Sequence, residues 1–248
     1  MSQFAFDYGD GRGPVYKDGR PMIKRKKRKG KSAGSKALKL AKENKRFIQK
    51  TIEMKQVNYQ QNATAITSLG FNAGSFLQVA TGAEDGSALG SAARIGNSIT
   101  LMRQQVCINL VGSGTDTYNQ FRVLIAESLD GNQPLVATDI LEYGSYALYG
   151  QTVFCSPYTT KTSTNKRYKI HYDKSFTLSG LATKGGVPPA KVIKKMIRYG
   201  KTGKELEYAG AGSLNPNNHR LTIMILTDSV SASHPELHYA VRSSYKDA

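Results

Sequence analysis

The chain has 248 residues and a formal net charge of +17, with 35 Lys and Arg against 18 Asp and Glu. A length of this order fits one all-β domain with an appendage, and the positive excess favours nucleic acid or another anionic partner. No apolar run reaches the roughly 18 residues of a membrane-spanning helix, and no apolar secretory core follows the N-terminus. We therefore expect a protein that is soluble, intracellular at synthesis and not inserted in a membrane.

The positive charge is concentrated near the N-terminus. Residues 1–55 hold 17 basic and 5 acidic residues, a balance of +12, whereas residues 56–248 hold 18 and 13, a balance of +5. This change in charge predicts a basic N-terminal arm over residues 1–52 and a folded domain over residues 53–248.

The arm itself has three parts. Residues 1–22 combine glycine with aromatic residues, and Phe4, Phe6, Tyr8 and Tyr16 either stack on unpaired bases or belong to a disordered tail. In residues 24–31 seven of eight residues are positively charged, so the segment repels itself and stays extended until it meets a polyanion. From Ser35 to Met54 the pattern changes to that of a basic amphipathic helix, with Ser35 as the expected cap.

The cations of the arm are the candidate nucleic-acid ligands. Lysine and arginine contact phosphates without selecting a base, so binding should weaken steeply with salt. The alternatives for the same residues are a nuclear-import signal, a solubilising tail and a helix on a membrane surface. The candidates are Lys24, Arg25, Lys26, Lys27, Arg28, Lys29, Lys31, Lys36, Lys39, Lys42, Lys45, Arg46 and Lys50. Arg103, on the polar side of its predicted strand, is either a further interior charge or simply solvated.

The remaining sequence has the period of β-strands. Large apolar residues recur at every second position over 106–110, 121–125 and 237–241, and the run 221–226 is nearly all apolar, as in a strand covered on both faces. In a further run of this kind, over residues 168–178, one face is predicted to carry Tyr168, Ile170, Tyr172, Phe176 and Leu178, with Lys174 interrupting the pattern. Turn-rich, glycine-containing connections separate the strands, which indicates an all-β sandwich or jelly roll.

Two segments depart from this pattern. Val192, Ile193, Met196 and Ile197, between two prolines and Gly200, locally favour a short helix over a strand. Residues 66–95 contain five glycines and are expected to form a long loop with a functional or interface role.

Motifs for catalysis or metal binding are absent from the pattern. In His234-Pro235-Glu236-Leu237-His238 the glutamate is misplaced for a zinc protease and proline opposes a helix, so a strand is expected. Residues 200–204 lack the glycine and hydroxyl of a phosphate loop, and the Ser163–Lys166 spacing is common by chance. Cys107 and Cys155 are expected to be free thiols. We expect no enzyme activity, no cofactor and no metal.

A succession of short sequence segments along the chain resembles the pattern of a known protein family. Arg94–Ile99 follows a glycine-rich loop and opens a strand, and later strings follow it in a recognisable order: 121–125, 170–178, 191–199, 221–228 and 239–242. Together with the basic arm, over about residues 24–248, they are similar to the capsid proteins of circular single-stranded DNA viruses that encode a replication initiator (CRESS-DNA viruses). Those proteins resemble the jelly roll of satellite tobacco necrosis virus.

The resemblance implies an eight-stranded antiparallel single jelly roll, with strands B to I in two sheets, and it makes residues 191–199 strand G. It also implies an icosahedral T=1 shell of about sixty copies that packages circular single-stranded DNA, with RNA as the other candidate genome. Localisation in the virion, and in the host nucleus during assembly, follows, with the nuclear-import machinery as a further partner. The arm upstream of Lys24 is longer than in the simplest members, and its role stays open.

Other classes compete with this interpretation. A ribosomal or nucleoid protein with a β body explains the charge but not the long glycine-rich loops. A jelly-roll lectin with an import tail is a second rival, which the absence of tryptophan disfavours; an enzyme is the third.

Overall fold

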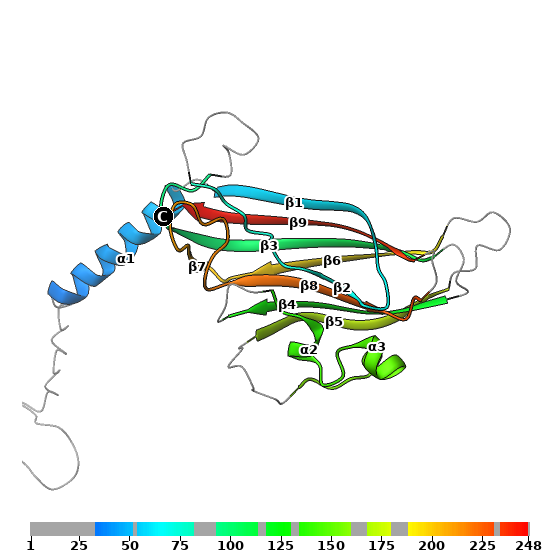
Figure 1. The fold of residues 1–248 in the computed structure, drawn as a ribbon. Coiled ribbons are helices and arrows are strands. Elements are labelled where there is room, and N and C mark those ends of the chain that lie inside the picture. Colours follow the sequence, from blue (N-terminus) through cyan, green and yellow to red (C-terminus); the bar gives the residue numbers. More distant parts are fainter. Residues whose placement is uncertain are drawn as a thin grey trace, which may run out of the picture. The chain divides into compact units, whose positions relative to one another are not determined.

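The computed structural model describes residues 33–51, 54–81, 93–113, 118–129, 134–159, 168–179, 188–230 and 234–247 (Figure 1). The chain divides into two compact units, Met1–Thr51 and Ile52–Ala248. No helix in the described ranges is long and apolar enough to cross a membrane.

The first unit contains one α-helix, α1 (Ala33–Thr51), which confirms the predicted helix. The prediction was wrong at its ends. Because the helix begins at Ala33, Ser35 lies inside the first turn and is not the cap, and Met54 already belongs to a strand. Leu38 and Leu40, which lie on nearly opposite sides of the helix, are both 59 % exposed.

The second unit is a sandwich of two antiparallel sheets (Figure 1). The first sheet has the order β1-β9-β3-β6, with β7 also paired to β3, and the second has the order β2-β8-β4-β5. The first sheet contains β1 (Met54–Ala65), β3 (Ser98–Val111), β6 (Ala190–Arg198), β7 (Lys204–Glu207) and β9 (Glu236–Asp247). The second sheet contains β2 (Phe71–Ala73), β4 (Tyr118–Ser128), β5 (Tyr168–Ser179) and β8 (Arg220–Thr227).

This strand order is that of a single jelly roll. If β7 is set aside and the other strands are lettered B to I along the chain, the sheets read B-I-D-G and C-H-E-F. The predicted all-β fold is therefore confirmed, with β7 as an additional short strand between G and H. Strand C, β2, lies within residues 66–95, so the prediction of an uninterrupted loop there was wrong.

Residues 190–198 form a strand, so the local prediction of a helix was wrong and the strand implied by the family resemblance is correct. Ile193 and Ile197 are buried on one face, while Val192 and Met196 are exposed on the other. A spacing of four residues returns to the same face in a strand as well as in a helix. The apolar pattern therefore could not separate the two, and pairing with β3 decides the outcome.

The core between the sheets is built from the alternating residues of the central strands. Val106, Ile108 and Leu110 of β3 face Phe121, Val123 and Ile125 of β4, and all six are 0 % exposed. From β8, Leu221, Ile223 and Ile225 enter the same core, whereas Met224 and Leu226 face the opposite side. The prediction that 221–226 is covered on both faces is confirmed.

A β-bulge redirects β5. Ile125 of β4 pairs with Tyr172 but the next residue, Ala126, pairs with Ile170, so His171 is the extra residue. A bulge shifts which face the following side chains occupy. Tyr172 packs against the inner core and Ile170 against the outer apolar layer, so the prediction that residues 168–178 share one apolar face was wrong.

The outer face of the second sheet is covered by the segment between β4 and β5 (Figure 1). This segment carries α2 (Ala137–Ile140), α3 (Tyr146–Tyr149) and the 3-10 helix η2 (Gly150–Phe154). Arg122 of β4 secures it: two guanidinium nitrogens contact Asp173 at 2.9 and 2.7 Å, and a third donates to the carbonyls of Val153 and Ser156.

Arg94 joins three loop segments at one end of the domain. Its side chain is 0 % exposed and donates to the carbonyls of Val79, Gly96, Gly210 and Ser213. The guanidinium carbon also lies 4.2 Å from the centre of the Tyr208 ring. Carbonyl dipoles and an aromatic face thus solvate a buried cation, in an arrangement that only the planar, five-donor guanidinium can satisfy.

Candidate nucleic-acid interface and a buried polar cluster

The structure places the predicted nucleic-acid ligands in three groups. Lys24, Arg25, Lys26, Lys27, Arg28, Lys29 and Lys31 lie outside the described residues. Lys36, Lys39 and Lys42 are exposed on α1. Lys45, Arg46 and Lys50 lie within α1, but their side chains are outside what the structure describes.

The described cations of α1 are available to an anionic ligand. Lys39 forms an ion pair with Glu43 one turn later, at 3.6 Å between nitrogen and oxygen, with both side chains more than half exposed. Such an exposed pair stabilises the helix by at most about 0.5 kcal/mol, so a phosphate can readily replace Glu43 as the partner of Lys39. Their assignment as phosphate ligands stays a prediction.

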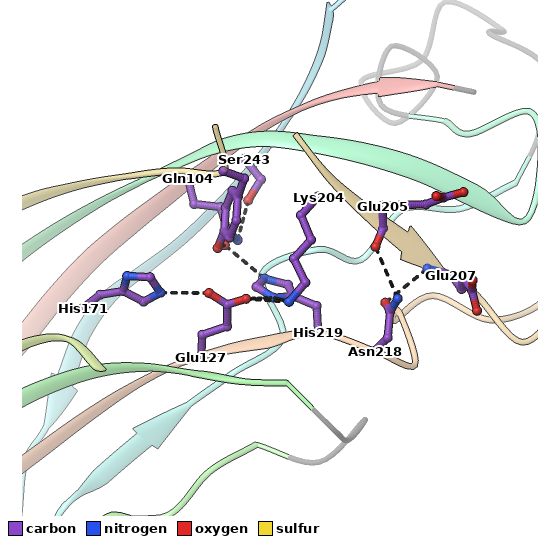
Figure 2. A network of polar contacts seen from close by, with 10 residues as sticks. Gln104, Glu127, His171, Lys204, Glu205, Glu207, Asn218, His219 and Ser243 are labelled. Atoms are coloured by element: carbon purple, nitrogen blue, oxygen red, sulfur yellow. Dashed lines mark hydrogen bonds and ion pairs between the residues drawn. The ribbon is translucent and has the colours of Figure 1, made fainter. Parts of the chain in front are cut away.

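Sequence reasoning did not find a cluster of polar side chains between the two sheets (Figure 2). Its centre is Glu127 at the end of β4, whose side chain is 3 % exposed. One carboxylate oxygen lies 2.8 Å from Nε2 of His171, and the other lies 2.6 Å from Nζ of Lys204 and 3.0 Å from Nδ1 of His219. Lys204 begins β7, and His219 immediately precedes β8.

The cluster continues into the first sheet through Gln104 of β3. Nε2 of His219 lies 3.2 Å from the side-chain oxygen of Gln104, which also accepts a hydrogen bond from the Tyr199 hydroxyl at 2.7 Å. The Gln104 amide donates to the Ser243 hydroxyl at 3.0 Å. A continuous polar chain therefore links β4 and β5 of one sheet to β3 and β9 of the other, at one end of the apolar core.

Burial and the surrounding charges set the protonation states of the cluster. Burial alone would raise the pKa of Glu127, but hydrogen bonds from His171 and His219, and the nearby Lys204, outweigh it and hold that pKa well below its ordinary value. Burial lowers the pKa of His219 and raises the pKa of Tyr199. At neutral pH the cluster thus holds Glu127 as a charged carboxylate.

The cluster has the properties of a structural element. The cavity beside Gln104 and His219 measures about 10 Å³, which is room for a single water and not for a substrate. The Lys204 side chain lies beside the Glu127 carboxylate, where a metal ion would otherwise have to bind. No group of His, Cys, Asp or Glu in the described ranges is arranged to hold a metal. Fully satisfied buried networks of this kind hold their elements in one arrangement.

The cluster predicts that acid destabilises the domain. The unfolded chain binds a proton at histidine near pH 6.5 and at glutamate near pH 4.3, whereas His219 and Glu127 in the folded chain bind theirs only at lower pH. The unfolded state therefore binds more protons, and stability falls as pH falls, by up to about 1.4 kcal/mol per pH unit for each proton difference. Urea unfolding from pH 8 to pH 4 should show a decline beginning near pH 6.5 and steepening near pH 4.3.

A matched pair of variants tests whether His219 causes the decline in stability near pH 6.5. His219→Asn should remove the decline near pH 6.5, whereas His238→Asn should retain it, because the His238 side chain is 37 % exposed. A free energy of unfolding that stays constant from pH 8 to pH 5 in the unmodified protein would contradict the prediction.

One sequence signal for this cluster was present. Gln104 shares the parity of Val106, Ile108 and Leu110, and Glu127 shares the parity of Phe121, Val123 and Ile125, which face the inner core. A polar residue that continues a buried apolar alternation must find partners inside the domain. His171 carries no such signal, because only the bulge turns it inward.

The other motifs resolve as structural features. His238 lies on β9, beside Glu236, and His234 lies in the segment that leads into this strand, as expected of a strand approach. Residues 200–204 form the turn into β7. Cys107 and Cys155 are free, and Ser163 and Lys166 lie outside the described residues.

No protein-family model and no curated protein matches this sequence. Among solved structures, similar chains come from Desmodium yellow mottle tymovirus (8 % identity, TM-score 0.38, covering 79 % of this chain and 88 % of that one) and from turnip yellow mosaic virus (11 %, 0.37, 79 % and 94 %). A chain from sacbrood virus of honeybee is also similar (8 %, 0.31, 78 % and 87 %). At these TM-scores the strand order given above, and not the likeness, defines the fold.

Proposed function

We propose that this chain is a capsid subunit, which assembles into a closed shell and packages nucleic acid through its basic arm. The observation that carries the proposal is a jelly roll preceded by an arm in which seven of the eight residues 24–31 are positively charged. Jelly rolls also occur in lectins and cupins. The arm distinguishes the chain from these, because a run of like charges is stabilised by a polyanion and not by a small ligand.

The filled core also supports a structural role. The apolar side chains of both sheets meet between the described strands, where a jelly roll that binds a ligand inside the sandwich needs an open cavity. The chain is in this proposal a building element without a catalytic or cofactor site.

The finer proposal follows the family resemblance. About sixty copies form a T=1 icosahedral shell around a circular single-stranded DNA, and sixty arms of +12 supply roughly 700 positive charges against the phosphates. The shell is the virion, and the same basic residues serve for import into the host nucleus before assembly. The phosphate ligands are the thirteen cations between Lys24 and Lys50 named above.

The test uses the full chain and a variant in which Lys24–Lys29 and Lys31 are replaced by serine. Size-exclusion chromatography, negative-stain electron microscopy and the absorbance ratio at 260 and 280 nm report particle formation and bound nucleic acid. We expect uniform particles with nucleic acid from the unmodified chain, and loss of the nucleic acid from the serine variant.

A comparison variant keeps the charge and removes the aromatics. Replacing Phe4, Phe6, Tyr8 and Tyr16 by serine should leave packaging intact, since the phosphate contacts remain. A monodisperse monomer at every salt and protein concentration contradicts the shell and leaves a soluble nucleic-acid-binding protein of ribosomal or nucleoid type. Particles that keep their nucleic acid in the serine variant contradict the role of the arm.

A further inference from the structure

The outer faces of the two sheets differ. The segment 134–159 covers the outer face of the second sheet with apolar side chains. On the first sheet, the residues of β3 and β6 that point away from the core remain accessible: Arg103 and Gln105 are exposed, Val192 is 54 % exposed and Met196 is 39 % exposed. In the described part of residues 52–248, no helix lies against this face (Figure 1).

Four cations lie close together on this bare face, in addition to Lys246 nearer the end of β9. The register places Arg103 of β3 directly opposite Arg198 of β6, and Cys107 opposite Lys194. Arg242 of β9 lies opposite Gln105, two residues along β3 from Arg103. Neighbouring strands are about 4.8 Å apart, so these side chains, here called the cationic face (Arg103, Lys194, Arg198 and Arg242), span only three adjacent strands.

The cationic face lacks compensating carboxylates in the described structure. Its recorded polar contacts are neutral: Arg103 donates to the Ser244 hydroxyl at 3.2 Å, and Arg242 donates to the side-chain oxygen of Asn58 at 2.9 Å. The carboxylates on this side, Glu205, Glu207 and Glu236, lie toward the two ends of β3. Like charges directly opposite each other destabilise a sheet, so the Arg103–Arg198 pair favours binding of an anion that spans both residues.

A hollow lies beside these cations. It has a volume of about 350 Å³ and is lined by Asn58, Gln60, Gln105, Cys107, Ala240 and Arg242. The small side chain of Ala240 forms its floor, between the longer side chains of the flanking strands. Side-chain amides both donate and accept hydrogen bonds, as the edge of a nucleobase does.

We infer that the outer face of β1-β9-β3-β6 is a second nucleic-acid-binding surface, separate from the arm. It holds a single strand, with phosphates on Arg103, Lys194 and Arg198 and an unstacked base in the hollow over Ala240. The inference rests on the proposed packaging function and deepens it. The two surfaces have different roles. The arm neutralises phosphate charge without ordering the nucleic acid, and the cationic face holds a short stretch of the nucleic-acid strand in one position.

The first experiment compares charge variants on the two edge strands. Lys194→Gln with Arg198→Gln removes two exposed cations from β6, and Lys169→Gln with Lys174→Gln removes two exposed cations from β5 of the other sheet. Binding of a short single-stranded DNA to each full-length protein is measured against salt concentration. Each phosphate contact contributes about 0.7 to the magnitude of the slope of log affinity against log salt. The slope of the β6 variant should therefore be smaller by about 1.4, and the slope of the β5 variant should equal that of the unmodified chain.

The second experiment uses the two cysteines as position markers. Cys107 borders the hollow, whereas Cys155 is exposed at the end of η2, on the covering segment of the other sheet. A photo-crosslinker is attached to Cys107 in a Cys155→Ser protein and to Cys155 in a Cys107→Ser protein. The DNA should crosslink to Cys107 and not to Cys155, and the β6 charge variant should lose the crosslink although its arm is intact.

The outcomes separate the two proposals. Equal slopes for both variants, or equal crosslinking from both cysteines, overturn the second surface while leaving binding by the arm in place. Crosslinking of Cys107 to another protein chain also overturns it and identifies the face as a subunit contact. No binding of DNA by the unmodified chain at low salt contradicts the packaging function itself.

Discussion

Replacing Arg94 with methionine is expected to lower the free energy of unfolding by about 4 kcal/mol or more. The side chain is fully buried and donates to four carbonyls from three separate segments. Each carbonyl left without a partner in the interior destabilises the fold by about 1 to 3 kcal/mol. Methionine fills the volume but supplies no donor, so the loss falls on the loops around residues 79, 96 and 210–213.

Equilibrium urea unfolding, followed by tyrosine fluorescence, measures the change. Arg94→Lys should recover only a small part, because one ammonium cannot reach carbonyls on three segments as a planar guanidinium does. Arg103→Met is the matched control: this arginine is exposed and should change stability by no more than about 0.5 kcal/mol. An Arg94→Met protein within 1 kcal/mol of the parent would show that water replaces the guanidinium, and the prediction would be wrong.

Replacing Glu127 with alanine is expected to destabilise the domain by about 3 to 5 kcal/mol, the usual effect of removing one partner from a buried charged pair. The substitution leaves Lys204 without its counter-ion and removes the acceptor that faces His171 and His219. Lys204 is 25 % exposed and can turn toward solvent, whereas His219 is fully buried and cannot. The larger part of the loss therefore comes from the histidines.

Two further variants locate the effect at pH 7. Glu127→Gln keeps an oxygen acceptor and removes the charge, so its stability should lie between those of the parent and the alanine variant. Glu205→Ala removes an exposed carboxylate from β7, the strand that carries Lys204, and its effect should be within about 0.5 kcal/mol. If Glu127→Ala and Glu205→Ala unfold at the same urea concentration, the cluster does not hold the two sheets together.

The central strands could be predicted from the sequence because their burial follows the period of two. Val106, Ile108 and Leu110 alternate with polar residues on a sheet that is bare on one side, and the all-apolar run 221–226 lies in the strand covered on both sides. Edge strand β6 was ambiguous, since Ile193 and Ile197 satisfy helix and strand alike. Assigning it as a strand required knowledge of its neighbour β3, and which strands pair is decided by the whole fold.

Neither polar site could be predicted in full, because both depend on register. Gln104 and His219 are 115 residues apart in the chain, and His171 joins them only through the extra residue of a bulge. Likewise Arg103 and Arg198 become neighbours only when β3 pairs with β6 in one register. The basic arm can be identified from local composition alone. A cluster that forms only when distant strands pair cannot be identified from the local spacing of residues.

The position of β9 has a consequence for the order of events during synthesis. The first sheet has the order β1-β9-β3-β6, so the strand made last lies between the first and the third. A chain emerging from the ribosome presents its basic arm early, but this sheet cannot form until residues 236–247 have been made. The growing chain can thus present its basic arm to a polyanion before the first sheet exists, and in the capsid proposed above any subunit contact through this sheet has to follow synthesis of β9.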